Sequence, residues 1–132
     1  MYLRFYGTRG SIPTPMVNTE FGAKLRAVLS KVAEKNADLS TEEARENFLN
    51  SLPFELTRTY GGNTSCVYLK IDDTHIILDM GSGIRQLGRD FMMAGNTVND
   101  FHIFLSHLHW DHIQGLPFFV PAYIKGKNIR IY

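Results

Sequence analysis

Short apolar runs separated by turn residues occupy both ends of the chain and most of its second half. Their β-branched and aromatic content predicts strands at residues 2–6, 55–60, 65–71, 75–78, 101–105 and 129–132. Asp72-Asp73-Thr74 separates two of these runs by a short polar turn, which predicts a β-hairpin. The alternating pattern therefore indicates that much of the chain forms a sheet.

Two segments have a helical period instead. Between about residues 20 and 52, the apolar residues of the first helix recur every three or four positions: Phe21, Leu25, Val28, Leu29 and Val32. Ser40 precedes Glu43 by three residues, which predicts a capping box for a second helix that ends at about Leu52, before Pro53. We expect a helical insert whose apolar stripe is a core or an interface. A further helix is predicted to open at Asp79-Met80-Gly81-Ser82-Gly83 and to run through about Met93. A short helix is predicted at residues 113–123.

Composition restricts the class of protein. The 132 residues are 44% hydrophobic and 20% charged, which is typical of a globular domain, and no apolar run reaches membrane-spanning length. The single cysteine, Cys66, excludes an internal disulfide; we expect it to be buried and the protein to be cytoplasmic. The net charge is +1 and no basic cluster is evident, which argues against a long nucleic acid as substrate.

Three of the five histidines lie within six residues, in His107-Leu108-His109-Trp110-Asp111-His112. Neutral imidazole and carboxylate are ligands for borderline metal ions, so this spacing predicts a metal centre. His107 and His109 are two residues apart, so an extended backbone places both on one side, while Asp111 and His112 need a turn to join them. One short segment can thereby serve two neighbouring ions. His75 and His102 lie in predicted strands and are interpreted as ordinary strand residues.

Other polar residues leave two interpretations open. Asp79 follows a predicted strand and precedes a helix, so it is either the helix N-cap or a residue that supports the metal ligands. The segment 7–13 contains two glycines and a proline and is either a structural turn or a loop that presents backbone N–H groups, Arg9 and Ser11 to an anionic substrate. Asn63 is a further candidate at the same rim, although a structural turn explains it better.

Four motifs, in this order along the chain, resemble the metallo-β-lactamase superfamily of metallohydrolases, and the branch that holds ribonuclease Z and related phosphodiesterases most of all. They are Gly7-Thr8-Arg9-Gly10-Ser11-Ile12-Pro13, Tyr60-Gly61-Gly62-Asn63-Thr64-Ser65-Cys66, Ile77-Leu78-Asp79-Met80-Gly81-Ser82-Gly83 and His107-Leu108-His109-Trp110-Asp111-His112. The resemblance implies an α/β (α+β) fold, half of an αββα sandwich, with a mixed sheet, flanking helices and the insert at about 20–52. It implies that His107 and His109 bind one divalent ion and that Asp111 and His112 bind the second. It also implies that Asp111 is catalytic and that Asp79 supports the ligands without binding an ion itself. Zinc is the expected metal, with manganese and iron as alternatives.

The resemblance also implies three further ligands C-terminal to the cluster, but no Asp or His follows His112. We therefore expect residues 1–132 to be the N-terminal part of one domain, inactive alone, that self-associates or pairs with a missing C-terminal half. The favoured activity is metal-dependent hydrolysis of a small phosphodiester or a cyclic nucleotide. Ribonuclease Z-type RNA processing and thioester or lactone hydrolysis are the alternatives among enzymes, and an inactive metal-binding fragment is the alternative outside them.

Overall fold

The computed structural model describes residues 1–95 and 97–132. The chain forms two compact units, which are described separately. The first combines residues 1–15 with residues 61–132, and the second is residues 16–60.

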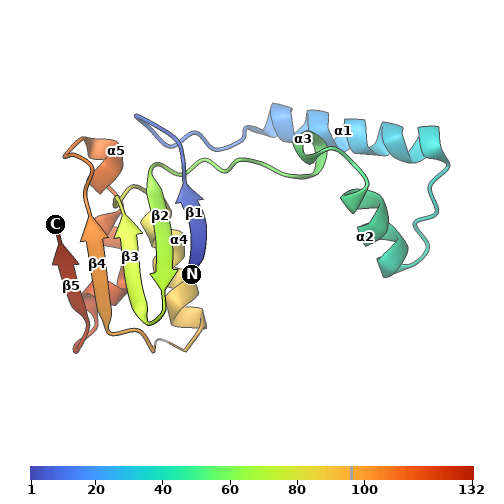
Figure 1. Cartoon of the computed structure of the whole chain (residues 1–132). Coiled ribbons are helices and arrows are strands. Elements are labelled where there is room, and N and C mark those ends of the chain that lie inside the picture. Colours follow the sequence, from blue (N-terminus) through green and yellow to red (C-terminus); the bar gives the residue numbers. More distant parts are fainter. Residues whose placement is uncertain (96) are drawn as a thin grey trace. The chain divides into compact units, whose positions relative to one another are not determined.

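The first unit is built on one five-stranded mixed sheet with the strand order β1-β2-β3-β4-β5 (Figure 1). The strands are β1 (Tyr2–Gly7), β2 (Cys66–Ile71), β3 (Thr74–Leu78), β4 (Asp100–Phe104) and β5 (Asn128–Ile131). β1, β2 and β3 pair antiparallel, whereas β3, β4 and β5 pair parallel. The predicted hairpin between β2 and β3 is confirmed, and Asp72 adopts a positive φ of 50° in its turn.

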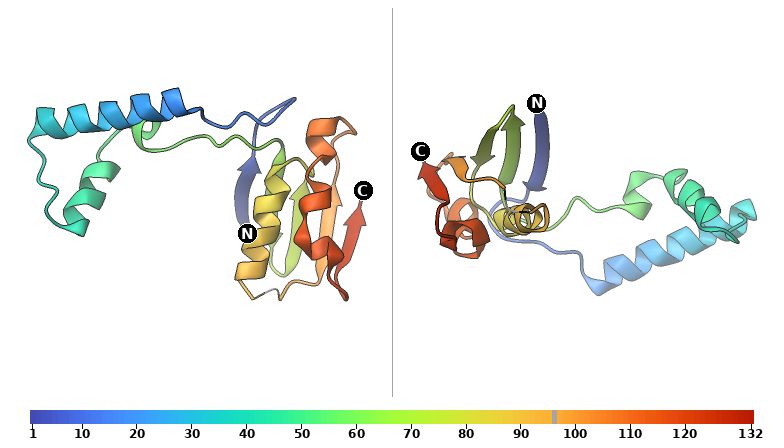
Figure 2. Two further views of the ribbon diagram at one scale, coloured as in Figure 1. Left: turned by 180° about the vertical axis from the view of Figure 1, so that it is seen from behind. Right: turned by 90° about the horizontal axis from the view of Figure 1, so that it is seen from below.

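The helices of this unit are α4 (Gly83–Met93) and α5 (Trp110–Ile113), followed by the 3₁₀ turns η1 (Leu116–Phe118) and η2 (Val120–Tyr123). α4 and the two 3₁₀ turns lie side by side on one face of the sheet (Figure 2). The prediction of one helix over residues 113–123 is wrong. Pro117 and Pro121 lack the backbone N–H that a continuous helix needs, so the segment forms separate short turns.

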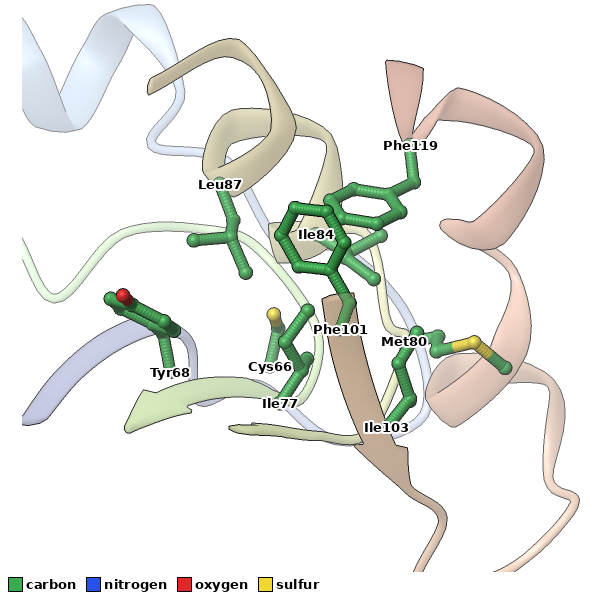
Figure 3. Packing of buried hydrophobic residues seen from close by; sticks show 9 residues of the cluster. All are labelled: Cys66, Tyr68, Ile77, Met80, Ile84, Leu87, Phe101, Ile103 and Phe119. Atoms are coloured by element: carbon green, nitrogen blue, oxygen red, sulfur yellow. The ribbon is translucent and has the colours of Figure 1, made fainter. Parts of the chain in front are cut away.

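The core lies between the sheet and this helical layer, as Figure 3 shows. Ile77, Phe101 and Ile103 project from adjacent strands toward Leu87 of α4. Phe119 packs edge-on against Phe101, with 5.3 Å between the ring centroids. Cys66 is fully buried in the same cluster, as predicted. The first unit is thus an α+β fold with flanking helices, compatible with half of an αββα sandwich.

The opposite face of the sheet is also apolar. The strand register aligns Phe5, Val67, Leu78 and Phe104 in one row across four strands, and Tyr132 stacks on Phe104 at 4.7 Å between centroids. Of these, Phe5, Leu78 and Phe104 are exposed. We call this row the open sheet face, because the helices of the first unit lie on the other side.

The second unit contains α1 (Asn18–Lys35), α2 (Glu42–Asn50) and α3 (Phe54–Thr57). The helical insert is confirmed, but the N-cap of α2 is Thr41 and not Ser40, since the Thr41 hydroxyl accepts from the Ala44 N–H at 3.1 Å. The predicted strand at residues 55–60 is wrong, because Pro53 with φ −55° begins the one-turn helix α3 there.

No residue of these three helices is buried. The apolar stripe of α1, which includes Phe21, Leu25 and Leu29, is therefore exposed within the second unit. In the part of the chain that the structure describes, no helix has both the length and the apolar character needed to cross a membrane.

Candidate metal centre

The candidate centre lies where two parallel strands end at the same edge of the sheet. Asp79 follows β3, and the segment that begins at Ser106 follows β4. The Asp79 N–H donates to the Phe104 carbonyl at 2.9 Å, and the Met80 N–H donates to the His112 carbonyl at 2.7 Å. These two backbone hydrogen bonds hold the turn after β3 against the histidine segment.

Gly81 permits this close approach. A Cβ atom at this position would lie 2.5 Å from the carbonyl oxygens of both Ser65 and Asp111, nearer than van der Waals contact allows. The glycine in Asp79-Met80-Gly81-Ser82-Gly83 is thus required by the backbone that carries Asp111. The motif therefore serves to bring two distant segments of chain together.

The predicted ligands gather in space as well as in sequence. The His107 ring centroid lies 4.4 Å from that of His109 and 4.1 Å from that of His112. Asp111 is buried, and its Oδ2 lies 3.4 Å from Nε2 of His112. The turn of α5, whose first residues are Trp110 and Asp111, brings the last two donors alongside the first two.

Asp79 is held by four hydrogen-bond donors. Its Oδ1 accepts from the backbone N–H of Ser106 at 2.9 Å and from the Ser106 hydroxyl at 2.8 Å. Its Oδ2 accepts from the Ser65 hydroxyl at 2.9 Å and lies 2.8 Å from Nδ1 of His112. A carboxylate offers about four lone-pair positions, so this one is saturated and has none left for a metal ion. Asp79 therefore orients His112.

The electrostatics of Asp79 agree with this arrangement. Burial alone would raise the pKa of the carboxyl group, but the hydrogen bonds from Ser106, His112 and Ser65 outweigh it and hold the pKa below its ordinary value. The group is thus charged at neutral pH. The alternative interpretation of Asp79 as a helix N-cap is wrong, because the N-cap of α4 is Ser82. Asp79 instead has a positive φ of 62° at the end of β3.

Asp111 is held by the glycine-containing loop at residues 7–13. The Ser11 backbone N–H donates to Oδ2 of Asp111 at 2.8 Å, across 100 positions of sequence. Burial acts to raise the pKa of Asp111, but this hydrogen bond and the neighbouring His112 and His107 hold it below its ordinary value. Ser11 has a positive φ of 63°, which aims its N–H at the carboxylate. The loop thus reaches the cluster through its backbone.

The other two loop candidates make different contacts. The Arg9 guanidinium donates to the Gly61 carbonyl at 3.3 Å, so it pairs with the loop at residues 61–63. Asn63 donates to the Tyr6 carbonyl at 3.3 Å and accepts from the Ser82 hydroxyl at 3.1 Å. These contacts fit the structural-turn interpretation of Asn63.

Sequence reasoning missed the hydroxyl groups around the cluster. Ser65 and Ser106 hold Asp79, and buried Thr64 accepts from the Ser82 N–H at 2.8 Å and from Gln114 at 3.0 Å. The position of Ser106, directly before His107, was the one available signal. Serine is too common beside a strand end for that signal to stand out.

The donor set fits a divalent metal by its chemistry. Three imidazoles and one carboxylate suit zinc, and two ligand atoms about 2.1 Å from a tetrahedral zinc ion lie about 3.4 Å apart. The distance from Nε2 of His112 to Oδ2 of Asp111 has this value. Within residues 1–95 and 97–132, however, no three His, Cys, Asp or Glu side chains stand as they would around an ion.

Comparison with known proteins gives partial matches. The chain is 34% identical over 55 residues to ribonuclease Z of Haloarcula marismortui and 38% identical over 55 residues to ribonuclease Z of Natronomonas pharaonis. Each match covers 42% of this chain and 17% of the relative, so the chain spans about a sixth of the length of the curated relatives it matches. No family model matches the chain. At this coverage, the matches support a relationship of the metallo-β-lactamase type and a hydrolase, and no more.

Proposed function

We propose that this chain belongs to a metal-dependent hydrolase that cleaves phosphodiester bonds. The observation that carries the proposal is the convergence of His107, His109, Asp111 and His112 at one sheet edge, with His112 held by a saturated carboxylate. The two ribonuclease Z matches favour RNA processing over hydrolysis of a cyclic nucleotide.

In this proposal His107 and His109 would hold one divalent ion, and Asp111 and His112 would hold the other. When bound, two such ions, zinc or else manganese or iron, would activate water near neutral pH and offset negative charge that develops on the phosphoryl group.

Two residues outside the ligand set, Asp79 and Ser11, orient the candidate ligands His112 and Asp111. Asp79 accepts the Nδ1 proton of His112, which would leave the Nε2 lone pair of that ring free to bind a metal ion beside Asp111. The Ser11 N–H fixes the Asp111 carboxylate from the other side. Because the resemblance implies seven ligands and this chain supplies four, we expect the chain alone to hydrolyse substrate slowly or not at all.

The test is a substrate panel with bis-p-nitrophenyl phosphate, a single-stranded RNA, cyclic AMP and a thioester. It is run on the chain alone and on the chain extended to the length of its relatives. Metal-dependent turnover of the phosphodiesters, lost on His109→Ala and kept on His102→Ala, is the expected result. His102 is the matched control because it lies in β4 and contacts Tyr132, outside the cluster. Thioester turnover without phosphodiester turnover would overturn the proposal.

A further inference from the structure

A groove runs along the first unit beside α4, and none of the four candidate ligands lines it. Two adjoining hollows share Arg85, Gln86 and Phe118 in their linings. One extends to Arg89 and Tyr123, and the other extends to Pro13, Asn63 and Gln114. We call this continuous depression the α4 groove.

The walls of the groove are fixed by tight packing. α4 lies against η1 and η2 (Figure 2). A Cβ atom on Gly88 would come within 2.9 Å of the Phe119 ring and 3.1 Å of Pro121. Phe119 is fully buried beneath this contact. The ring of Phe118, the neighbouring residue, lies on the surface and is 60% exposed. The groove is therefore part of the folded unit.

The lining is basic and aromatic. Arg85 and Arg89 are one helical turn apart on α4 and so lie on one face of it, and both are exposed. In the part of the chain that the structure describes, neither guanidinium forms an ion pair, and no acidic residue lines either hollow. The acidic neighbour Asp90 binds Arg4 and Tyr6, and accepts a hydrogen bond from the groove residue Gln86 at 2.8 Å. The groove thus presents two guanidinium groups beside two exposed rings, Phe118 and Tyr123, the latter 71% exposed.

One end of the groove adjoins the candidate metal centre. Pro13 lines that end and is two residues from Ser11, whose N–H donates to Asp111. Gln114 lines it as well and is two residues from His112. A ligand that follows the groove from Tyr123 toward Pro13 therefore reaches the two chain segments that carry Ser11 and His112.

From these observations we infer that the α4 groove binds a single-stranded polynucleotide, with phosphates on Arg85 and Arg89 and bases stacked on Phe118 and Tyr123. Guanidinium groups with exposed aromatic rings are the combination that single strands need, because the arginines neutralise the backbone and every base offers a face for stacking. A cyclic nucleotide has one base, whereas the successive bases of a strand can stack on Phe118 and Tyr123 at once. The inference deepens the proposed function, since it names the polymer whose phosphodiester would reach the centre.

The test is equilibrium binding to the whole chain in EDTA, so that its outcome is independent of metal and of hydrolysis. The probe is a fluorescent oligouridylate, with oligodeoxythymidylate of equal length to separate RNA from DNA and polyglutamate to represent an acidic protein. Arg85→Gln with Arg89→Gln is compared with Lys70→Gln with Arg130→Gln, which changes the net charge equally on strands β2 and β5, away from the groove.

We expect the groove variant to make the salt dependence of log K less steep by about 1.4, since each phosphate contact to a single strand contributes about 0.7. Phe118→Leu should weaken binding by roughly 5- to 150-fold, the effect of losing one stacked base. The matched control should bind as the unaltered chain does.

Three results would overturn the inference: no oligonucleotide binding, equal weakening in both double variants, or equally tight binding of polyglutamate. Far-ultraviolet circular dichroism of each variant identifies any loss of fold, and Phe118→Tyr, which keeps an aromatic face, should then retain binding. If the oligonucleotide binds but no phosphodiester is hydrolysed by the extended chain with metal, the proposed function fails while the groove assignment stands.

Discussion

Replacing Asp79 by asparagine changes one carboxylate oxygen to an amide NH₂ with nearly no change in shape. The Oδ1 side faces a backbone N–H of Ser106, which can only donate, so the amide oxygen must take that position. The NH₂ group then faces Ser65 and His112. The Ser65 hydroxyl can turn and accept. His112 can accept only through an unprotonated Nδ1, which moves its proton to Nε2.

The magnitude follows from the hydrogen bonds. A bond to a charged group contributes about 1 kcal/mol more than a neutral one, and all four bonds to Asp79 become neutral because the amide carries no charge. Asp79→Asn should therefore lower the free energy of unfolding by about 2–4 kcal/mol, less than the full sum because the amide is also less costly to bury, measured by urea denaturation. Because Nε2 of His112 then carries a proton, zinc affinity should fall by about 10- to 100-fold.

The assay combines urea unfolding, zinc titration and ¹⁵N NMR of the imidazole nitrogens in the metal-free chain. The NMR spectrum should show His112 protonated at Nδ1 in the unaltered chain and at Nε2 in the variant. Asp73→Asn, in the exposed β2–β3 turn, is the matched control and should change none of the three. Unaltered stability and an unaltered His112 tautomer in Asp79→Asn would refute the reasoning.

Four further outcomes are expected. Burial raises the pKa of the Cys66 thiol to about 12, so it should resist Ellman's reagent at pH 8 until urea unfolds the chain; rapid modification of the folded chain would contradict this. Burial, helped by Lys70, lowers the pKa of His75 below 6.5 in the folded state, so the unfolded state binds more protons in that window and stability is lost as the pH falls below about 6.5. The difference in pH-dependent unfolding between the unaltered chain and His75→Leu should show this loss. Phe101→Ala should lower the free energy of unfolding by about 3–5 kcal/mol in urea, since the ring is fully buried between Phe91 and Phe119. The open sheet face should make the isolated chain self-associate, and Phe104→Glu should reduce the molar mass in light scattering; a monodisperse monomer before the substitution would argue against it.

The sequence predicted the parts of the fold that depend on local pattern. The strands β2, β3 and β4 and the helix α4 follow alternation, turn residues and apolar runs, and they lie where these signals place them. The strand prediction at residues 55–60 is wrong because Pro53, which ends the preceding helical pattern, also favours the start of a new helix. The prediction of one helix at residues 113–123 is wrong because Pro117 and Pro121 interrupt the apolar pattern of that segment.

In the candidate centre, too, the sequence predicts what depends on neighbouring residues and not what depends on contacts between distant ones. The four candidate ligands lie within six residues of sequence, so their proximity could be predicted from spacing alone. The contact of Ser11 with Asp111 joins residues 100 positions apart and depends on a positive φ that no pattern of residue types reveals. The four donors to Asp79 likewise come from three residues, Ser65, Ser106 and His112, on two separate segments of chain. The α4 groove depends on how side chains from separate segments shape the surface, and the hydrophobic periodicity of the sequence does not reveal that shape.

The most direct test of the central claim is zinc titration of the chain, followed calorimetrically, beside the variants His109→Ala and His102→Ala. The account predicts measurable binding to the unaltered chain, at least tenfold weaker binding to His109→Ala and unchanged binding to His102→Ala. Equal affinity for all three chains, or no zinc binding even when the chain is extended to the length of its relatives, would contradict it.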